Sequence, residues 1–324
     1  MKKIYILLIL SLLTTFLVGC KSKEVVNIYE NGLDEERIDI QENEDENTEE
    51  QEAEEEVIDL VEAISKNIDE ILGEYKDNVS IYFKNLNTNE EYILNGDTYY
   101  VAASTTKVPL CMMILDDVNN GSKTLNDLLY FTEADREGGS GSLYHLDEVP
   151  NLTIEEAIYL SIVDSDNIAK NMLSRVASSS VTDYMRYVTD DYNIPYGNYT
   201  TAKQFGILLN NLYENQDNNP YYSTLIDYMT ETSYHDRLDK YLDYEIVAHK
   251  IGNYYRYYHD VGIIYGADPY ILVVLTKDIG ELSDESFENE GEDERFVLDW
   301  GEEACELIAK ISEEIYTLVD KSKK

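Results

Sequence analysis

Ser104 and Lys107 are a pair of residues whose types and spacing could do chemistry. They lie in the stretch VAASTTKVPL, residues 101–110, where a run of small residues meets an apolar segment. A serine hydroxyl is a poor nucleophile at neutral pH and needs a base within hydrogen-bond reach. If the apolar segment is a helix, positions three apart share a face, so the Lys107 amine can reach the Ser104 hydroxyl. Taken alone, the pair equally fits a helix-capping serine and a solvated lysine.

Two further polar clusters follow this pair along the chain. Residues 165–167 read Ser-Asp-Asn, and residues 250–252 read Lys-Ile-Gly. The order S-x-x-K, S-D-N and K-T-G is the signature of class A β-lactamases and penicillin-binding proteins. The sequence resembles that family from about residue 57 to residue 320. Without the other motifs, Ser165 and Asn167 would fit hydrogen bonding at a helix-to-loop junction.

The resemblance implies a catalytic role for four side chains. Ser104 would be the nucleophile, and Lys107 the general base that takes its proton. Ser165 would relay a proton to the leaving nitrogen of the substrate. Lys250 would attract the substrate carboxylate and polarise Ser165.

The resemblance also implies an oxyanion hole and a substrate site. The backbone N–H groups of Ser104 and Asn253 would bind the oxyanion. Asn167 would bind the catalytic lysine and the amide carbonyl of the substrate. Gly252 would let the substrate backbone lie flat against the edge of a strand.

The third motif departs from the family pattern at its middle position. Ile251 stands where the family usually has Thr or Ser, and its side chain cannot hydrogen-bond a carboxylate. Recognition of the substrate acid must therefore be weaker or come from elsewhere. Asn253, Arg256 and His259 are nearby candidates for that contact.

A second departure concerns removal of the acyl group. Class A β-lactamases carry a Glu in the loop after S-D-N, and that Glu activates the water that clears the acyl-enzyme. Between Asn167 and Thr201 this sequence has no Glu, and its only acids are Asp183, Asp190 and Asp191. Without a positioned base, attack on the ester is expected to fall by about 10²–10⁴-fold.

The N-terminus has the pattern of a secretory signal. Two lysines precede an apolar run that is too short to span a membrane. The run ends in Leu-Val-Gly-Cys, which resembles the lipobox of bacterial lipoproteins, where the Cys is lipidated. We expect residues 1–20 to be a lipoprotein signal peptide, with Cys20 anchoring the protein to the outer face of the bacterial cell membrane. An ordinary signal peptide that contains a Cys is the alternative.

The composition of the chain excludes some classes of partner and cofactor. The 324 residues carry a formal net charge of -41, which repels nucleic acid and predicts no such partner. Residues 21–56 are acidic with few apolar groups, so we expect a disordered tether. Cys111 and Cys305 are expected to be buried free thiols, with a single bridge as the alternative. The four histidines show no metal-ligand spacing, and no metal or cofactor is predicted.

Apolar periodicity predicts an α+β domain over residues 57–324. It begins with a helix at 57–75 and a β-hairpin, continues with helices over about 116–240, and ends with three β-runs and a helix at about 292–319. We expect one antiparallel sheet of about five strands covered by the N- and C-terminal helices. An all-helical lobe would flank the sheet, with the active site between them, in a monomer.

These observations predict a serine hydrolase that forms an acyl-enzyme at Ser104 with β-lactams or D-alanyl peptides and deacylates slowly. One alternative is an active β-lactamase that uses another base. Another is a catalytically inactive lipoprotein that binds the cell wall.

Overall fold

The computed structural model describes residues 59–266, 268–283 and 301–322. The expected signal peptide, with Cys20, and the expected acidic tether lie outside these ranges. Within them, no helix has the length and apolar character needed to cross a membrane.

A five-stranded antiparallel sheet lies at the centre of the domain, in the order β2-β1-β9-β8-β7. Its strands are β1 (Val79–Asn85), β2 (Glu91–Leu94), β7 (Val247–Tyr254), β8 (Tyr257–Tyr265) and β9 (Pro269–Lys277). The pairing of β1 with β9, with Tyr82 opposite Val273, joins the early hairpin to the late meander. This confirms the expected sheet. Its edge strand β7 carries the third motif.

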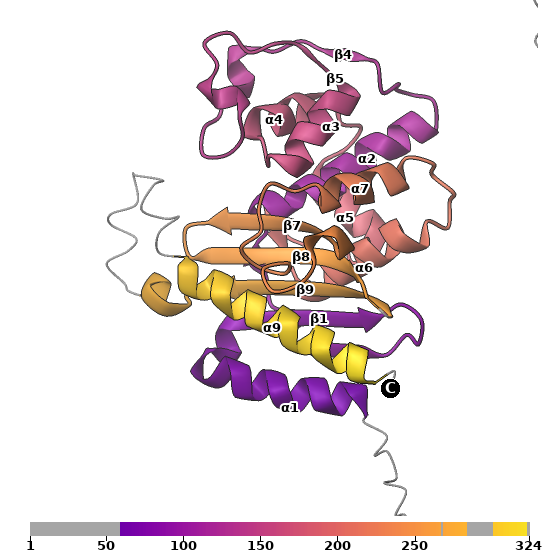
Figure 1. Cartoon of the computed structure of the whole chain (residues 1–324). Coiled ribbons are helices and arrows are strands. Elements are labelled where there is room, and N and C mark those ends of the chain that lie inside the picture. The colour runs from indigo at the N-terminus through magenta and orange to yellow at the C-terminus, as the bar shows by residue number, and fades with distance from the viewer. Residues whose placement is uncertain (1–58, 267, 284–300, 323–324) are drawn as a thin grey trace, which may run out of the picture. The chain divides into compact units, whose positions relative to one another are not determined.

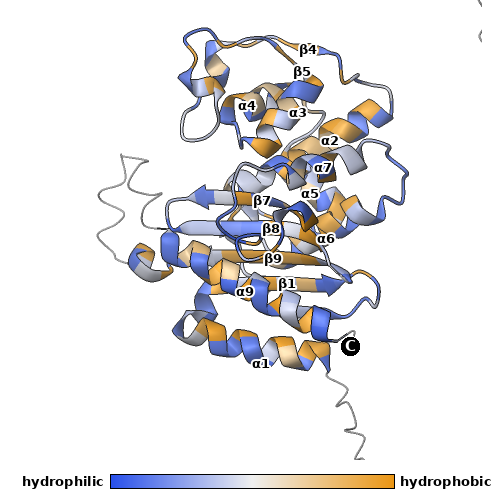
Figure 2. Ribbon diagram, in the orientation of Figure 1, coloured by the Kyte–Doolittle hydropathy of each residue, from blue (hydrophilic) through white to orange (hydrophobic). Residues whose placement is uncertain are grey.

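The two terminal helices, α1 (Leu60–Leu72) and α9 (Glu302–Lys321), lie side by side over one face of the sheet (Figure 1). In α1 the buried residues recur every four positions, which makes one apolar stripe. They are Leu60, Ile64, Ile68 and Leu72. Figure 2 shows both helices with an apolar and a polar side. Together with one face of the sheet they enclose a hydrophobic core.

Six helices form the lobe that follows the hairpin. They are α2 (Lys107–Asn119), α3 (Ile154–Val163), α4 (Asn167–Val176), α5 (Val181–Thr189), α6 (Ala202–Glu214) and α7 (Tyr222–Thr230). Capping boxes start α3 at Thr153 and Glu156 and α6 at Thr201 and Gln204. A second hydrophobic core joins this lobe to the other face of the sheet.

The domain also contains two short two-stranded sheets. They pair β3 (Tyr100–Val101) with β6 (Tyr199–Thr200), and β4 (Leu128–Leu129) with β5 (Leu152–Thr153). The 3-10 helices are Gly73–Asn78, Ala103–Thr106, Glu133–Asp135, Leu143–His145, Tyr244–Ile246 and Gly280–Ser283. The β3–β6 pair matters for the site because it ties the segment before Ser104 to the segment before α6.

Candidate active site

Ser104 lies in the 3-10 turn Ala103–Thr106, directly before α2, and is partly exposed. Ala103 has a φ of 51°, in the left-handed region that a residue with a Cβ adopts at a cost. The turn is held by Ala102 N, which donates to Asn198 O at 3.0 Å, and by Thr105 Oγ1, which donates to Ala102 O at 2.6 Å. Backbone N–H groups at a helix start have no partner within the helix. The Ser104 N–H is one of these and suits an oxyanion hole.

Lys107 is the first residue of α2, and only 1% of it is exposed. Its Nζ lies 3.1 Å from Ser104 Oγ, 3.1 Å from Ser165 Oγ and 2.8 Å from Asn167 Oδ1. It also donates to the Ser165 carbonyl. The structure therefore brings the first two motifs together around one amine.

The surroundings of Lys107 favour its neutral form. Burial is the main cause that holds the pKa of its amine well below the usual value of 10.5, and the charges of Lys250 and Lys170 add to the effect. The carboxylates of Asp166 and Glu137 oppose it. A neutral amine at 3.1 Å from Ser104 Oγ can accept the hydroxyl proton.

The Ser165–Asn167 loop joins α3 to α4 and is held by Asp166. The buried Asp166 carboxylate caps α4, accepting from Ala169 N at 2.9 Å, and also accepts from Leu143 N at 2.9 Å. Gly141 packs against it so closely that an added Cβ would lie 2.2 Å from Asp166 Oδ2. Asp166 therefore positions the loop, while Ser165 and Asn167 meet Lys107.

Asn167 also connects the motif to the glycine-rich segment 138–145. Its Nδ2 donates to Gly138 O at 2.7 Å, and its backbone N–H donates to Ser140 O at 3.2 Å. The amide oxygen must face Lys107, because the amide nitrogen is used by Gly138. These bonds fix the orientation of the Asn167 side chain.

Lys250 lies on β7 and is completely buried. Burial lowers the pKa of its amine to about 7, with Asp260 opposing and Arg237 adding to the shift. The amine lies over the Tyr234 ring, 5.7 Å from its centroid. Within the part of the chain that the structure describes, it donates to Ile251 O at 3.3 Å and not to Ser165. Polarisation of Ser165 by a direct hydrogen bond from Lys250 is thus not seen.

Gly252 lies where β7 passes the Ser104 turn. An added Cβ would lie 2.9 Å from Ala102 O and 3.1 Å from Thr105 N. Glycine is therefore needed for the strand to approach the nucleophile's turn, a packing reason that differs from the expected contact with substrate. Asn253 follows it, and its buried Oδ1 has no hydrogen-bond partner among the described residues.

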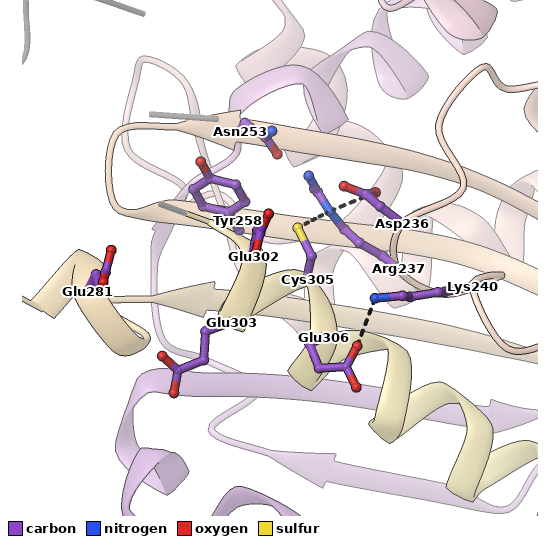
Figure 3. A pocket seen from close by; sticks show the side chains of 10 residues that line it. All are labelled: Asp236, Arg237, Lys240, Asn253, Tyr258, Glu281, Glu302, Glu303, Cys305 and Glu306. Carbon is purple, nitrogen blue, oxygen red and sulfur yellow. Dashed lines mark hydrogen bonds and ion pairs between the residues drawn. The ribbon is translucent and has the colours of Figure 1, made fainter. Parts of the chain in front are cut away.

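A cavity of about 820 Å³ lies beside Asn253 (Figure 3). Its lining residues are Asp236, Arg237, Lys240, Asn253, Tyr258, Glu281, Glu302, Glu303, Cys305 and Glu306. Ser104 and Lys107 do not line it.

Arg237, one of the lining residues, is a buried cation that the sequence analysis missed. No motif around it in the sequence indicates that its side chain is buried. Its Nη1 donates to His259 O at 2.7 Å.

Two of the expected carboxylate-binding candidates have other partners. His259 is buried, and its Nε2 lies 2.8 Å from Val101 O while its Nδ1 accepts from Thr276 N. Burial lowers the pKa of this imidazole to about 4, so it is neutral. Arg256 Nη1 lies 3.0 Å from Asp278 Oδ1. His259 therefore ties β8 to the strand before Ser104 and does not offer a charge to substrate.

Of the three acids between Asn167 and Thr201, Asp183 and Asp191 have hydrogen-bond partners of their own. Asp191 accepts from Gln204 Nε2 at 2.6 Å, and hydrogen bonds with Asn193 and Gln204 lower its pKa. Asp190 ends α5 with a φ of 51°. Asp183 accepts from Ser180 Oγ at 2.7 Å. In the described ranges, none of the three hydrogen-bonds Ser104 or Lys107.

The two cysteines of the domain, Cys111 and Cys305, are free and buried. The expectation of buried thiols is confirmed, and the alternative of a single bridge is wrong. Burial raises the pKa of the Cys111 thiol to about 12. Burial also raises the pKa of the Cys305 thiol to about 11, and a thiol that keeps its proton is a weak nucleophile.

Comparison with known proteins gives three kinds of match. A family model described as the beta-lactamase enzyme family matches residues 63–319. Beta-lactamase VEB-1 from Pseudomonas aeruginosa is 24% identical over 213 residues, and the match covers 58% of this chain and 71% of VEB-1. Beta-lactamase from Sphaerobacter thermophilus DSM 20745 has a TM-score of 0.66 at 21% identity, covering 80% of this chain and 97% of that chain.

PBP-A is a further structural relative. A single-residue mutant of PBP-A, solved as an acyl-enzyme complex with penicillin G, has a TM-score of 0.67 at 20% identity. The match covers 81% of this chain and 97% of that chain. These structures share the α+β fold of this domain, which confirms the fold expected from the sequence.

Proposed function

Because the chain belongs to the beta-lactamase enzyme family, we propose that it is a serine hydrolase that forms an acyl-enzyme at Ser104. The substrates are β-lactams or D-alanyl peptides, and release of the acyl group is slow. The observation that carries this proposal is the 3.1 Å contact between Lys107 Nζ and Ser104 Oγ. The amine in that contact is buried, and its pKa is lowered.

Acylation follows from the contacts around Lys107. The neutral amine takes the Ser104 proton while Oγ bonds to the carbonyl carbon, and the N–H groups of Ser104 and Asn253 stabilise the oxyanion. When the carbonyl reforms, the C–N bond breaks and Ser165 donates its proton to the leaving nitrogen. Lys107 returns a proton to Ser165 across their 3.1 Å contact. The acyl group is then an ester of Ser104, and Lys107 is neutral again.

Substrate binding is assigned to the groups beside the nucleophile. Asn167 would bind the amide carbonyl of the substrate through its side chain, and the backbone at Gly252 would align the substrate. Lys250 would attract the substrate carboxylate. No such contact can come from the side chain of Ile251, so we expect weaker recognition of the acid than in relatives with Thr or Ser there.

Slow deacylation is proposed because none of the three acids between Asn167 and Thr201 is placed to act as its base. A water that attacks the ester needs a general base. Asp183, Asp190 and Asp191 make no hydrogen bond with Ser104 or Lys107, and the pKa values of Asp183 and Asp191 are lowered. A carboxylate with a lowered pKa is a weaker base. Among the structural neighbours, a PBP-A mutant has been solved as an acyl-enzyme with penicillin G.

Incubation with penicillin G followed by intact-mass measurement tests the proposal. We expect a lasting adduct of one penicillin on the wild-type chain and none on Ser104→Ala. Rapid hydrolysis without an adduct would instead favour an active β-lactamase, the activity named in several relatives. Absence of both adduct and hydrolysis would favour an inactive cell-wall-binding protein. An adduct on Ser104→Ala would refute the assignment of the nucleophile.

Asn198→Glu tests the reason for slow release. The Asn198 side chain lies on the nucleophile's turn, with Nδ2 3.4 Å from Ala103 O. A carboxylate there is expected to shorten the lifetime of the adduct by about 10-fold or more. The matched control is Asn198→Gln, which has the same length without the charge. Equal adduct lifetimes for the two variants would show that a missing base does not limit release.

We also propose that the protein is a monomer and that lipidated Cys20 anchors it to the outer face of the bacterial cell membrane. The support for the anchor is the N-terminal sequence, in which an apolar run ends at Leu-Val-Gly-Cys. Cell fractionation tests it: Cys20→Ala should move the protein out of the membrane fraction. A protein that stays there would contradict the lipid anchor.

A further inference from the structure

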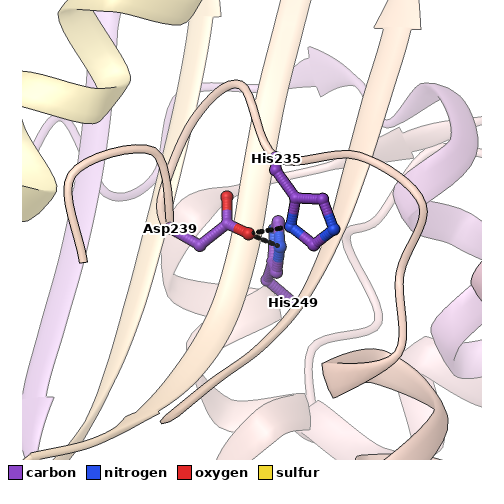
Figure 4. Close-up of side chains that lie close together, drawn as sticks. All are labelled: His235, Asp239 and His249. Carbon is purple, nitrogen blue, oxygen red and sulfur yellow. Dashed lines mark hydrogen bonds and ion pairs between the residues drawn. The ribbon is translucent and has the colours of Figure 1, made fainter. Parts of the chain in front are cut away.

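A second polar cluster lies on the other face of the strand that carries Lys250. Side chains alternate along a strand, so His249 points away from the side of its neighbour Lys250. His235 and Asp239 come from the loop before β7, and Figure 4 shows the Asp239 carboxylate between the two imidazoles. One ligand atom from each of the three residues lies within 4.8 Å of the others.

Two buried atoms of this cluster have incomplete hydrogen bonding. Among the described residues, His249 Nε2 and Asp239 Oδ1 make no hydrogen bond, although His249 Nε2 is ion-paired with the other oxygen of Asp239, Oδ2. His249 is completely buried, and Asp239 is 3% exposed. Unsatisfied buried polar atoms are costly and call for a ligand, an ion or a water. An imidazole nitrogen and a carboxylate oxygen are both atom types that bind transition metals.

The spacing fits a zinc-sized ion. His249 Nε2 lies 3.3 Å from Asp239 Oδ2. Two ligands bonded at about 2.0–2.1 Å in a tetrahedral zinc site are themselves about 3.3 Å apart. His235 is hydrogen-bonded to the same carboxylate through Nδ1. A small movement of that exposed side chain would therefore bring a third ligand to the ion.

The other ring nitrogen of His249, Nδ1, has a carboxylate partner, as metal-bound histidines usually do. Its Nδ1 lies 2.8 Å from Asp260 Oδ2 on β8. A carboxylate on the far ring nitrogen fixes the tautomer and directs Nε2 toward the metal. Asp260 Oδ2 also accepts from Leu238 N at 3.0 Å. Gly262 opposite His249 makes room for this arrangement, because a Cβ there would lie 2.8 Å from His249 Cβ.

We propose that His235, Asp239 and His249 form a binding site for a divalent transition metal ion, with Zn²⁺ the ion that fits best. Two imidazoles and one carboxylate supply three ligands, and water takes the fourth position. The His235 side chain is 48% exposed, which gives the ion a path from solvent. The bound ion would tie the loop at residues 235–239 to β7 and so stabilise the strand that bears Lys250 and Gly252.

Zinc titration of the full-length chain tests this site. After removal of metals with a chelator, Zn²⁺ is titrated in competition with a chromophoric chelator, and Tm is measured with and without Zn²⁺. His235→Ala removes an exposed ligand, so folding should be kept. It is expected to weaken zinc binding at least about 10-fold and to abolish the rise in Tm. His145→Ala, which removes another exposed histidine, is the matched control and should behave as wild type.

Cobalt separates this site from weak binding by the many carboxylates of the chain. Co²⁺ bound by two imidazoles and a carboxylate in a tetrahedral site absorbs strongly in the visible region, whereas Co²⁺ on exposed carboxylates does not. We expect that spectrum for the wild type and His145→Ala but not for His235→Ala or Asp239→Asn. Equal zinc affinity in the wild type and His235→Ala, or no tetrahedral spectrum in the wild type, would overturn the proposal and leave a hydrogen-bonded network. Acylation of Ser104 is a separate measurement and does not decide this result.

Discussion

The pKa of the Lys107 amine shows how burial suits a lysine for its proposed role as a base. In water its amine would be protonated at neutral pH, with a pKa near 10.5. Removal from water penalises the charged form, and nearby Lys250 and Lys170 penalise it further. Asp166 and Glu137 only partly offset this effect. The chemistry of Ser104 therefore depends on the burial of a neighbouring residue.

The rate of acylation should depend on pH through Lys107. Only the neutral amine can take the Ser104 proton, and a lowered pKa makes that form available at lower pH. We therefore expect the rate of adduct formation with penicillin G to rise with pH and level off well below 10.5. Stopped-flow or quenched mass measurements across pH would record this profile.

The matched variant is Lys107→Arg. A guanidinium keeps its proton at every accessible pH, so acylation should fall by at least about 100-fold, and no rising limb should remain. A Lys107→Arg variant that acylates with the wild-type pH profile would show that another group is the base.

At the scale of elements, the site depends on close approach between β7 and the Ser104 turn. Gly252 has no side chain, so the strand can lie against Ala102 O and Thr105 N. The turn is held from its other side by Asn198 O, through Ala102 N. The Ser104 turn is thus positioned between a strand and a loop that are distant in sequence.

Gly252→Ala should disturb the nucleophile more than the fold. Its Cβ would lie 2.9 Å from Ala102 O, so the turn must shift at a cost of about 1–3 kcal/mol. We expect acylation by penicillin G to slow about 10-fold or more, because small misplacements of reacting groups are costly. Circular dichroism should show the same secondary structure.

Gly266→Ala, at the residue that directly follows β8, is the control. There the nearest atom to an added Cβ is the edge of the Tyr316 ring, at 3.2 Å. Acylation should be close to that of the wild type. Similar slowing by both substitutions would indicate a general effect of alanine in the sheet rather than a local effect on Ser104.

At the scale of the whole domain, the sheet separates two hydrophobic cores that stabilise different parts of the structure. One core lies under α1 and α9, and the other joins the sheet to the helical lobe that carries the catalytic motifs. The first holds the sheet together from the face opposite the lobe. Stability and catalysis are therefore expected to respond separately to substitutions on the two sides.

Ile311→Ala tests this separation. Ile311 lies on α9 and is completely buried, so its truncation should lower the free energy of unfolding by about 2–5 kcal/mol. Below the unfolding transition the acylation rate should be unchanged. Lys310→Ala, at an exposed neighbour, should change stability by no more than about 0.5 kcal/mol. Loss of acylation in folded Ile311→Ala would show that the two sides are coupled.

The amino-acid sequence by itself determined the local elements and the candidates for the reacting groups. The four-residue spacing of apolar side chains specified α1, the Thr153 and Thr201 caps started their helices, and Ser104 with Lys107 marked the turn that we propose to be catalytic. These features depend on residues within a few positions of one another. Their physical causes therefore act before the chain is folded.

Only the tertiary structure decided which distant residues meet. It placed Ser165 and Asn167 on Lys107, kept Lys250 from bonding Ser165, buried Arg237 and gathered His235 and Asp239 around His249. It also decided protonation, because burial and neighbouring charges shift a pKa only after the elements have packed. Short-range patterns carry no information on those long-range contacts, and for that reason sequence reasoning missed the histidine cluster.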